Sequence, residues 1–235
     1  MTGTTDGAAL FTDSLYAGDN SYMKLFLTSA GLTTDTLRAA FRALLPSNPR
    51  VAFVPTAARL YQDSSWLEAD IGNVRAAGVE VNLVDISLAP RSEWLEVFNK
   101  ADAFCFGGGN TYFLLDWIRR CGLAETLPAL LESRVYMGIS AGSMVAGPSV
   151  ESNSPIFPEE DEGKIDDLRG LSLVPFAVVP HLNSAMFSKA RHENVKRFAD
   201  SVQYPVYALD DQSAIEVSEG KTRVVSTGDY KAYNN

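Results

Sequence analysis

The sequence predicts an α/β protein with a doubly wound, mostly parallel sheet, helices on both of its faces and a C-terminal β-hairpin. Two observations carry this prediction. Continuous apolar runs, which suit strands buried on both faces, alternate with longer amphipathic runs from residue 22 to residue 140. This alternation is typical of parallel sheets, whose strands are joined by crossover helices. Near the end of the chain, residues 213–227 form two strand-like runs around Glu219-Gly220, which predicts the hairpin.

The first part of the chain contains three predicted strand–helix units. The strands are the apolar runs "YMKLFLTS", "RVAFVPT" and "VEVNLVDI", at residues 22–29, 50–56 and 79–86. The helices follow them at residues 33–45, 64–78 and 91–101. The first helix carries Leu37, Phe41 and Leu44 on one face, and Gly78 ends the second helix.

The next strand, residues 102–110, runs into three consecutive glycines. Two helices are predicted after it, at residues 111–122 and 123–133, and both show helical periodicity. The apolar strand 134–140 then ends at Ser140. Each of these strands therefore ends in a segment of small or polar residues.

The alternation breaks after Val150. Residues 151–170 are polar, acidic and contain proline, which predicts a long loop. Its acidic part, residues 159–167, is expected to be solvated or to form a lid. The pattern then resumes in a strand, a helix and a strand, at residues 177–183, 188–202 and 205–211.

Length and composition predict one domain, residues 20–235, after a loose arm at residues 1–19. The chain has 235 residues and a net charge of −9, which argues against a nucleic-acid partner. No apolar run is long enough for a membrane span, and the N-terminus does not resemble a secretory signal. Two cysteines without a ligand cluster predict no disulfide framework and no structural zinc site, and they fit a cytoplasmic location. We expect no cofactor. The assembly is left open, with a homodimer as one option.

Candidate functional residues follow the predicted strands, where parallel sheets form their sites. The sequence "GISAG" places Ser140 between two glycines at a strand-to-helix turn. Such a turn holds a serine in a strained conformation with its hydroxyl exposed, and the next helix directs free N–H groups towards a developing oxyanion. The pattern also fits a tight joint at which a small residue is needed. Ser140 is therefore a candidate nucleophile that requires a base.

The chain has two histidines, and His181 is the better candidate base. It follows the apolar residues 177–180 of the predicted strand 177–183, whereas His192 lies in a charged helix and is expected to be solvated. An orienting carboxylate could come from Asp210, Asp211 or Glu216, and the pattern leaves this choice open. The order serine, histidine, acid differs from that of α/β-hydrolases, which run serine, acid, histidine.

Four segments resemble, in order, the motifs of the peptidase E (aspartyl dipeptidase) family, whose more distant relatives are the cyanophycinases. They are "FGGGNTYFLL" (106–115), "YMGISAGSMVAGP" (136–148), "VVPHLN" (178–183) and "ALDDQSAIEV" (208–217). The resemblance covers residues 22–227 and implies a class I glutamine-amidotransferase-like, flavodoxin-like fold. It also implies a serine exopeptidase without a metal, acting on dipeptides or short peptides.

When the roles of the family's residues are carried over to the matching positions, the resemblance implies that Ser140 is the nucleophile, His181 the general base and Asp211 the third member of a catalytic triad. The backbone N–H groups of Gly109 and Ala141 are implied as the oxyanion site. The sequence has "DDQ" where peptidase E has "PEG", so a shorter carboxylate must reach the imidazole.

Substrate recognition is implied less directly. Peptidase E proper cleaves after an N-terminal aspartate, which calls for a cation in the pocket. Arg191 lies near the position of such an arginine, and Asn110 ends the glycine run. Both are candidate substrate contacts. A cyanophycinase-like β-aspartyl peptidase and a catalytically inactive binding or sensor protein that keeps the fold are the alternatives.

Overall fold

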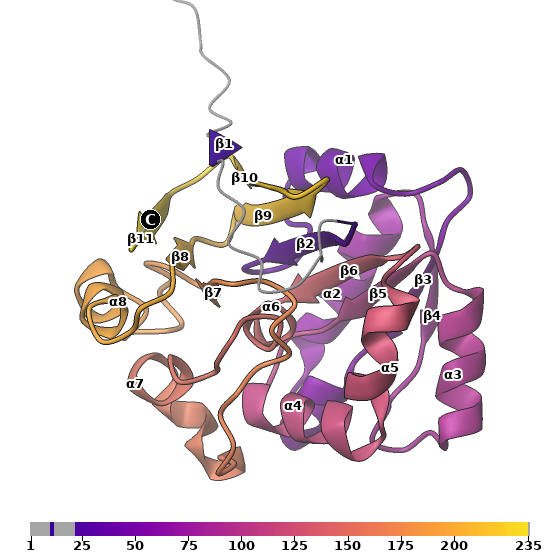
Figure 1. Ribbon diagram of the computed structural model, residues 1–235, viewed down its shortest axis with the longest axis horizontal. Helices are drawn as coiled ribbons and strands as arrows, with labels where there is room; N and C mark the ends of the chain where they lie inside the picture. The colour runs from indigo at the N-terminus through magenta and orange to yellow at the C-terminus, as the bar shows by residue number, and fades with distance from the viewer. Residues whose placement is uncertain (1–9, 12–21, 235) are drawn as a thin grey trace, which may run out of the picture.

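The computed structural model describes residues 10–11 and 22–234 of the chain, so the predicted arm lies outside it except for Leu10–Phe11. The predicted fold class is confirmed (Figure 1). The main sheet of the described residues has eight strands, in the order β1-β10-β9-β2-β6-β5-β3-β4. These strands are β1 (Leu10–Phe11), β2 (Lys24–Thr28), β3 (Arg50–Val54), β4 (Glu80–Leu83), β5 (Ala103–Phe106), β6 (Val135–Ile139), β9 (Ser213–Ser218) and β10 (Lys221–Ser226). The strands from β2 to β4 pair in parallel, and β9 and β10 form the predicted hairpin at the other side.

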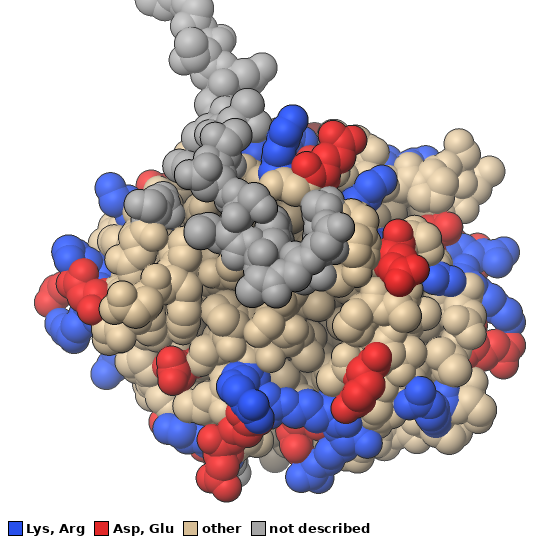
Figure 2. Space-filling model, in the orientation of Figure 1, with Lys and Arg blue, Asp and Glu red and all other residues tan. Residues whose placement is uncertain are grey.

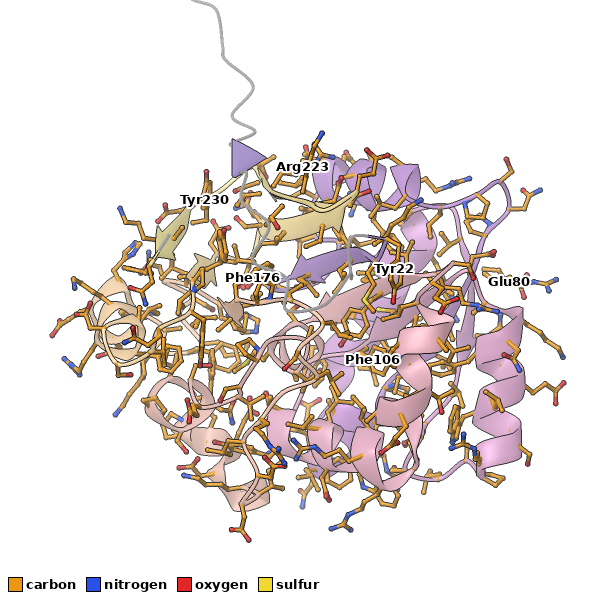
Figure 3. All side chains as sticks on the ribbon, in the orientation of Figure 1. Tyr22, Glu80, Phe106, Phe176, Arg223 and Tyr230 are labelled. Carbon is orange, nitrogen blue, oxygen red and sulfur yellow. The ribbon has the colours of Figure 1, made fainter. Side chains whose placement is uncertain are left out.

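Helices cover both faces of this sheet because its strands are apolar on both sides (Figure 1). The helices are α1 (Asp35–Ala43), η1 (Thr56–Leu60), α2 (Ser65–Ala76), α3 (Arg91–Lys100), α4 (Thr111–Arg120), α5 (Leu123–Leu130), α6 (Ala141–Met144), α7 (Asn153–Ile156), η2 (Pro158–Gly163) and α8 (His192–Ala199). In β5, Ala103 and Cys105 belong to the core cluster under α1 and α2. Phe104 and Phe106 belong to the cluster under α3, α4 and α5. The labelled Phe106 lies in this second layer (Figure 3), stacked on Tyr136 with ring centres 4.9 Å apart.

A second sheet, which the sequence did not distinguish from the first, contains three strands from the C-terminal third of the chain. Its strands are β7 (Ala177–Val179), β8 (Val206–Leu209) and β11 (Tyr230–Tyr233). The strands β7 and β8 are parallel, and β11 pairs with β8 in the antiparallel sense. Helices α7 and α8 lie on the same side of the molecule as this sheet (Figure 1). A separate apolar cluster joins them to it. The doubly wound pattern therefore ends at β6.

The segment predicted to be a long loop, residues 151–170, contains α7 and η2 instead. Ile156 and Phe157 are buried in the cluster that joins α7 to the second sheet. Glu160, from the part expected to be solvated, is only 6% exposed. The prediction failed because two apolar residues within an acidic stretch are enough to anchor it against the sheet.

On the face shown in Figure 2, basic and acidic side chains are interspersed, mostly towards the edge of the view. Among the described residues, no helix has both the length and the apolar character that crossing a bilayer requires.

Candidate active site

The turn after β6 holds Ser140 in a strained backbone conformation. Its φ is 49° and its ψ is −106°, which side chains rarely adopt, and its own N–H donates to Thr28 O at 3.1 Å. Glycine is required on both sides. A Cβ at Gly138 would lie 2.5 Å from Ser143 N, and one at Gly142 would lie 2.1 Å from Phe106 O. The close approach of helix α6 to β5 and β6 therefore explains the "GISAG" pattern.

His181 and Asp211 form a hydrogen-bonded chain with Ser140. The Nε2 atom of His181 lies 2.9 Å from Ser140 Oγ, and its Nδ1 atom lies 2.7 Å from Asp211 Oδ1. The two residues follow β7 and β8, so the second sheet supplies the imidazole and the carboxylate, while the main sheet supplies the hydroxyl. The His181 side chain is 13% exposed, which leaves the site shielded but reachable.

Of the three carboxylates considered from the sequence, Asp211 is the one that contacts the imidazole. Asp210 accepts hydrogen bonds from Gln212 N and Asp229 N and holds a turn. Glu216 forms an ion pair of 2.6 Å with Arg223.

The pKa of Asp211 lies below its ordinary value. Burial by itself raises the pKa of this carboxyl, but the hydrogen bond and charge of His181, with hydrogen bonds from Ser29 and Ser184, outweigh the burial. The carboxylate form is therefore the one that these contacts favour.

Ser29, which the sequence analysis missed, links the histidine and the aspartate. Its hydroxyl donates to Asp211 Oδ1 at 3.0 Å and accepts from the backbone N–H of His181 at 2.7 Å. The side chain is fully buried. Ser29 follows β2, which pairs with β6, so it leaves the sheet beside Ser140. Its place at the end of a predicted strand was the available signal, but no motif marks it.

The glycine run after β5 lies against the serine. A Cβ on Gly108 would lie 3.4 Å from the Cβ of Ser140. Gly109 has a φ of 130°, and a Cβ there would lie 2.3 Å from Ala57 O, so this position requires glycine. Ala141 begins helix α6, where an N–H group lacks an intrahelical acceptor. Both candidate oxyanion residues thus flank Ser140.

The structure does not bring Asn110 or Arg191 into the cavity lining. The Asn110 side chain caps α4 by accepting from Phe113 N at 2.9 Å, and it donates to Glu160 O at 3.0 Å. The Arg191 Nη1 atom donates to three backbone carbonyls at 2.9–3.1 Å. These carbonyls belong to residues 184, 187 and 190. Each side chain therefore has a structural use at its position.

A cavity of about 420 Å³ opens at the serine and the histidine. Aromatic rings form much of its wall, contributed by Tyr61, Trp66, Phe157 and Phe187. The Phe187 ring stacks on the His181 imidazole with ring centres 4.4 Å apart. Among the described residues, no group of three or more His, Cys, Asp or Glu side chains is arranged to hold a metal ion.

Four acidic residues also line the cavity: Asp70, Glu159, Glu160 and Asp211. Burial raises the pKa of Asp70 to about 7. Burial also raises the pKa of Glu160 to about 7, although Thr111 N donates to it at 2.6 Å and opposes the shift. Burial, with Glu160 and Glu159 nearby, raises the pKa of Tyr61 well above its ordinary value.

A strained serine at a strand-to-helix turn, hydrogen-bonded to a histidine whose other ring nitrogen bonds an aspartate, is typical of the class of serine hydrolases. Comparison with known proteins narrows this class. The sequence model of peptidase family S51 matches residues 25–225, and the chain belongs to this family. It is a serine peptidase, and the resemblance to peptidase E is confirmed.

The chain is 32% identical to a peptidase E of Streptomyces coelicolor, over 77% of this chain and 72% of that protein. It is 26% identical to the uncharacterized peptidase PM1590 of Pasteurella multocida, over 86% of this chain and 96% of that protein. Among solved structures, a peptidase from an acI-B1 Actinobacterium covers 89% of this chain and aligns over 91% of its own length. That alignment has a TM-score of 0.68 at 19% identity, which supports the fold.

Proposed function

We propose that this protein is an exopeptidase that hydrolyses dipeptides or short peptides through an acyl-enzyme, with Ser140, His181 and Asp211 as its catalytic triad. The observation that carries the proposal is the continuous chain of hydrogen bonds from Asp211 to Ser140, at 2.7 and 2.9 Å, at the mouth of the cavity. A cavity of about 420 Å³ suits a short substrate better than a folded protein.

In the first half of the reaction, Ser140 Oγ attacks the scissile carbonyl as His181 Nε2 takes its proton. The Asp211 carboxylate fixes the tautomer of the imidazole and stabilises the imidazolium. Negative charge develops on the carbonyl oxygen, where the N–H groups of Gly109 and Ala141 are the proposed donors. His181 then gives its proton to the leaving amine, and the amine departs.

In the second half, His181 removes a proton from a water molecule that attacks the acyl-serine ester. The same N–H groups stabilise the second oxyanion. The ester C–O bond then breaks as His181 returns the proton to Ser140 Oγ, and the acid product leaves. We place this reaction in the cytoplasm, where the free thiols of Cys105 and Cys121 stay reduced.

Replacement of Ser140 by alanine tests the proposal. We expect Ser140→Ala to lower kcat by at least about 10³-fold and to abolish labelling by a fluorophosphonate probe. Ser201→Ala is the matched control, since its hydroxyl donates to Phe198 O in helix α8 and takes no part in the triad. Unchanged turnover of dipeptides by Ser140→Ala, or a wild-type protein that the probe does not label, would contradict the mechanism.

A further inference from the structure

The ionisable lining of the cavity beside Ser140 is mostly acidic. Asp70, Glu159, Glu160 and Asp211 line it, and no lysine or arginine of the described chain joins them. Aspartate as the first residue of a substrate would bring another carboxylate into this lining. Like charges in a poorly solvated site repel strongly. The electrostatics of the cavity therefore oppose the aspartate preference that the resemblance to peptidase E implied.

Asp70 is a half-buried carboxyl of this lining, whereas Glu159 is exposed. It lies on helix α2, and no described residue forms a hydrogen bond or an ion pair with it, in contrast to Glu160 and Asp211. Burial is the cause that shifts its pKa upwards. A buried carboxylate without a partner is costly, and a cation placed beside it removes that cost.

Asp70 also lies near the reacting group. Its Oδ1 atom and the Ile139 Cδ1 atom are both 3.4 Å from the position that a Cβ of Gly31 would take. Ile139 directly precedes Ser140, and Ala30 and Ile139 line the same cavity. In a peptide cleaved after its first residue, the N-terminal ammonium is the cation closest to the scissile carbonyl. Asp70 therefore lines the same cavity as Ser140, close to the residue that precedes the nucleophile, where it can receive that ammonium.

The wall around these carboxyls is apolar and aromatic. Tyr61 and Trp66 pack edge to face with ring centres 6.3 Å apart, and Phe157 and Phe187 do so at 5.5 Å. Met186, which is 81% exposed, lines the same cavity. Such a wall stabilises apolar or aromatic side chains by removing their surface from water.

We propose that the cavity selects short peptides with a free N-terminal ammonium group and an apolar or aromatic first side chain, and that Asp70 binds the ammonium. This specificity rests on the proposed function of Ser140. It excludes peptides with N-terminal aspartate as preferred substrates. The carboxylate end of a dipeptide points away from Asp70, because the acidic lining repels it.

Three dipeptides test the proposal with the full-length protein: Leu-Ala, Asp-Ala and N-acetyl-Leu-Ala, their hydrolysis followed by mass spectrometry. We expect kcat/KM for Leu-Ala to exceed that for Asp-Ala by at least about 10-fold, the size of one charge-assisted contact. Asp70→Asn keeps the shape of the side chain and removes the charge. It should raise KM for Leu-Ala by about 10- to 100-fold and leave the slow cleavage of the acetylated peptide unchanged.

Glu68→Gln is the matched control, because it removes one charge from an exposed position of the same helix. It should leave all three rates unchanged. Faster cleavage of Asp-Ala than of Leu-Ala, or an equal loss for the free and acetylated peptides in Asp70→Asn, would overturn the specificity. Fluorophosphonate labelling distinguishes a wrong specificity from a wrong proposed function. If Ser140 is labelled, only the specificity is wrong, whereas an unlabelled wild-type protein would overturn the proposed function as well.

Discussion

One hydroxyl that is not part of the proposed triad fixes its geometry. Ser29 Oγ is bonded both to Asp211 Oδ1 and to the backbone N–H of His181, at 3.0 and 2.7 Å. His181 has a φ of 60°, an uncommon conformation that its surroundings must maintain. We infer that Ser29 is a positioning residue, acting through the histidine and the aspartate.

We therefore expect Ser29→Ala to lower kcat about 10- to 100-fold with little change in KM, because ground-state binding does not involve this hydroxyl. Steady-state kinetics on a cleaved dipeptide gives the two constants separately. Ser201→Ala again serves as the control for loss of a hydroxyl that bonds one carbonyl. A rise in KM with kcat unchanged would contradict the positioning role.

The three residues of the proposed triad could be predicted from the sequence, but the residues and strand pairings that hold them in place could not. Ser140, His181 and Asp211 each follow an apolar strand, and parallel strands bring such positions together. The choice between Asp210 and Asp211 depended on which one faces the histidine, and strand alternation only says that they face opposite ways. Ser29 is a serine at a strand end like many others. Its role depends on the pairing of β2 with β6, which no local pattern records.

At the scale of elements, the strand–helix alternation predicted all five parallel strands of the main sheet, although the edge strand β4 carries polar residues and is mostly exposed. The same signal could not show that β7 and β8 belong to another sheet. Short apolar strands look alike in sequence, and partner choice depends on contacts far along the chain. Strand β11 was missed for a related reason: it is only four residues long, and these residues are half-buried or exposed.

The loop before α8 is an element whose shape depends on Arg191. This side chain bonds the carbonyls of residues 184, 187 and 190, and the loop carries Phe187 onto the His181 ring. We expect Arg191→Ala to speed amide hydrogen exchange across residues 184–190 and to lower kcat/KM about 10-fold for all substrates alike, since the loop loses its fixed shape.

Arg197→Ala is the control for this prediction, because Arg197 pairs with Glu193 on the exposed side of α8. It should change neither quantity. A loss confined to substrates with N-terminal aspartate in Arg191→Ala would instead indicate the direct substrate contact implied by the resemblance to peptidase E.

At the scale of the whole molecule, the two sheets meet at the site, and buried carboxyls lie where they meet. Asp70 comes from the main-sheet layer, and Glu160 comes from the segment that connects the sheets. Burial raises the pKa of both groups to about 7, so each resists ionisation in the folded protein. The free energy of unfolding therefore depends on pH through these groups.

The sign follows from proton binding. Between pH 4.5, the ordinary pKa of glutamate, and pH about 7, its pKa in the fold, Glu160 keeps its proton when folded and loses it when unfolded. Stability due to this group is therefore full below pH 4.5 and falls as the pH rises through 7. The fall is of the order of 3 kcal/mol for this nearly buried side chain.

Glu160→Gln removes this dependence while keeping an acceptor for Thr111 N. We expect the difference in melting temperature, variant minus wild type, to increase by about 5–10 °C from pH 4.5 to pH 8. This difference cancels the contributions of the groups that both proteins share. One of these groups is Asp211, whose lowered pKa makes its contribution to stability fall as the pH falls. Glu132→Gln, at an exposed position, should show no such trend. Parallel melting curves for wild type and Glu160→Gln at every pH would mean that Glu160 ionises freely in the folded protein.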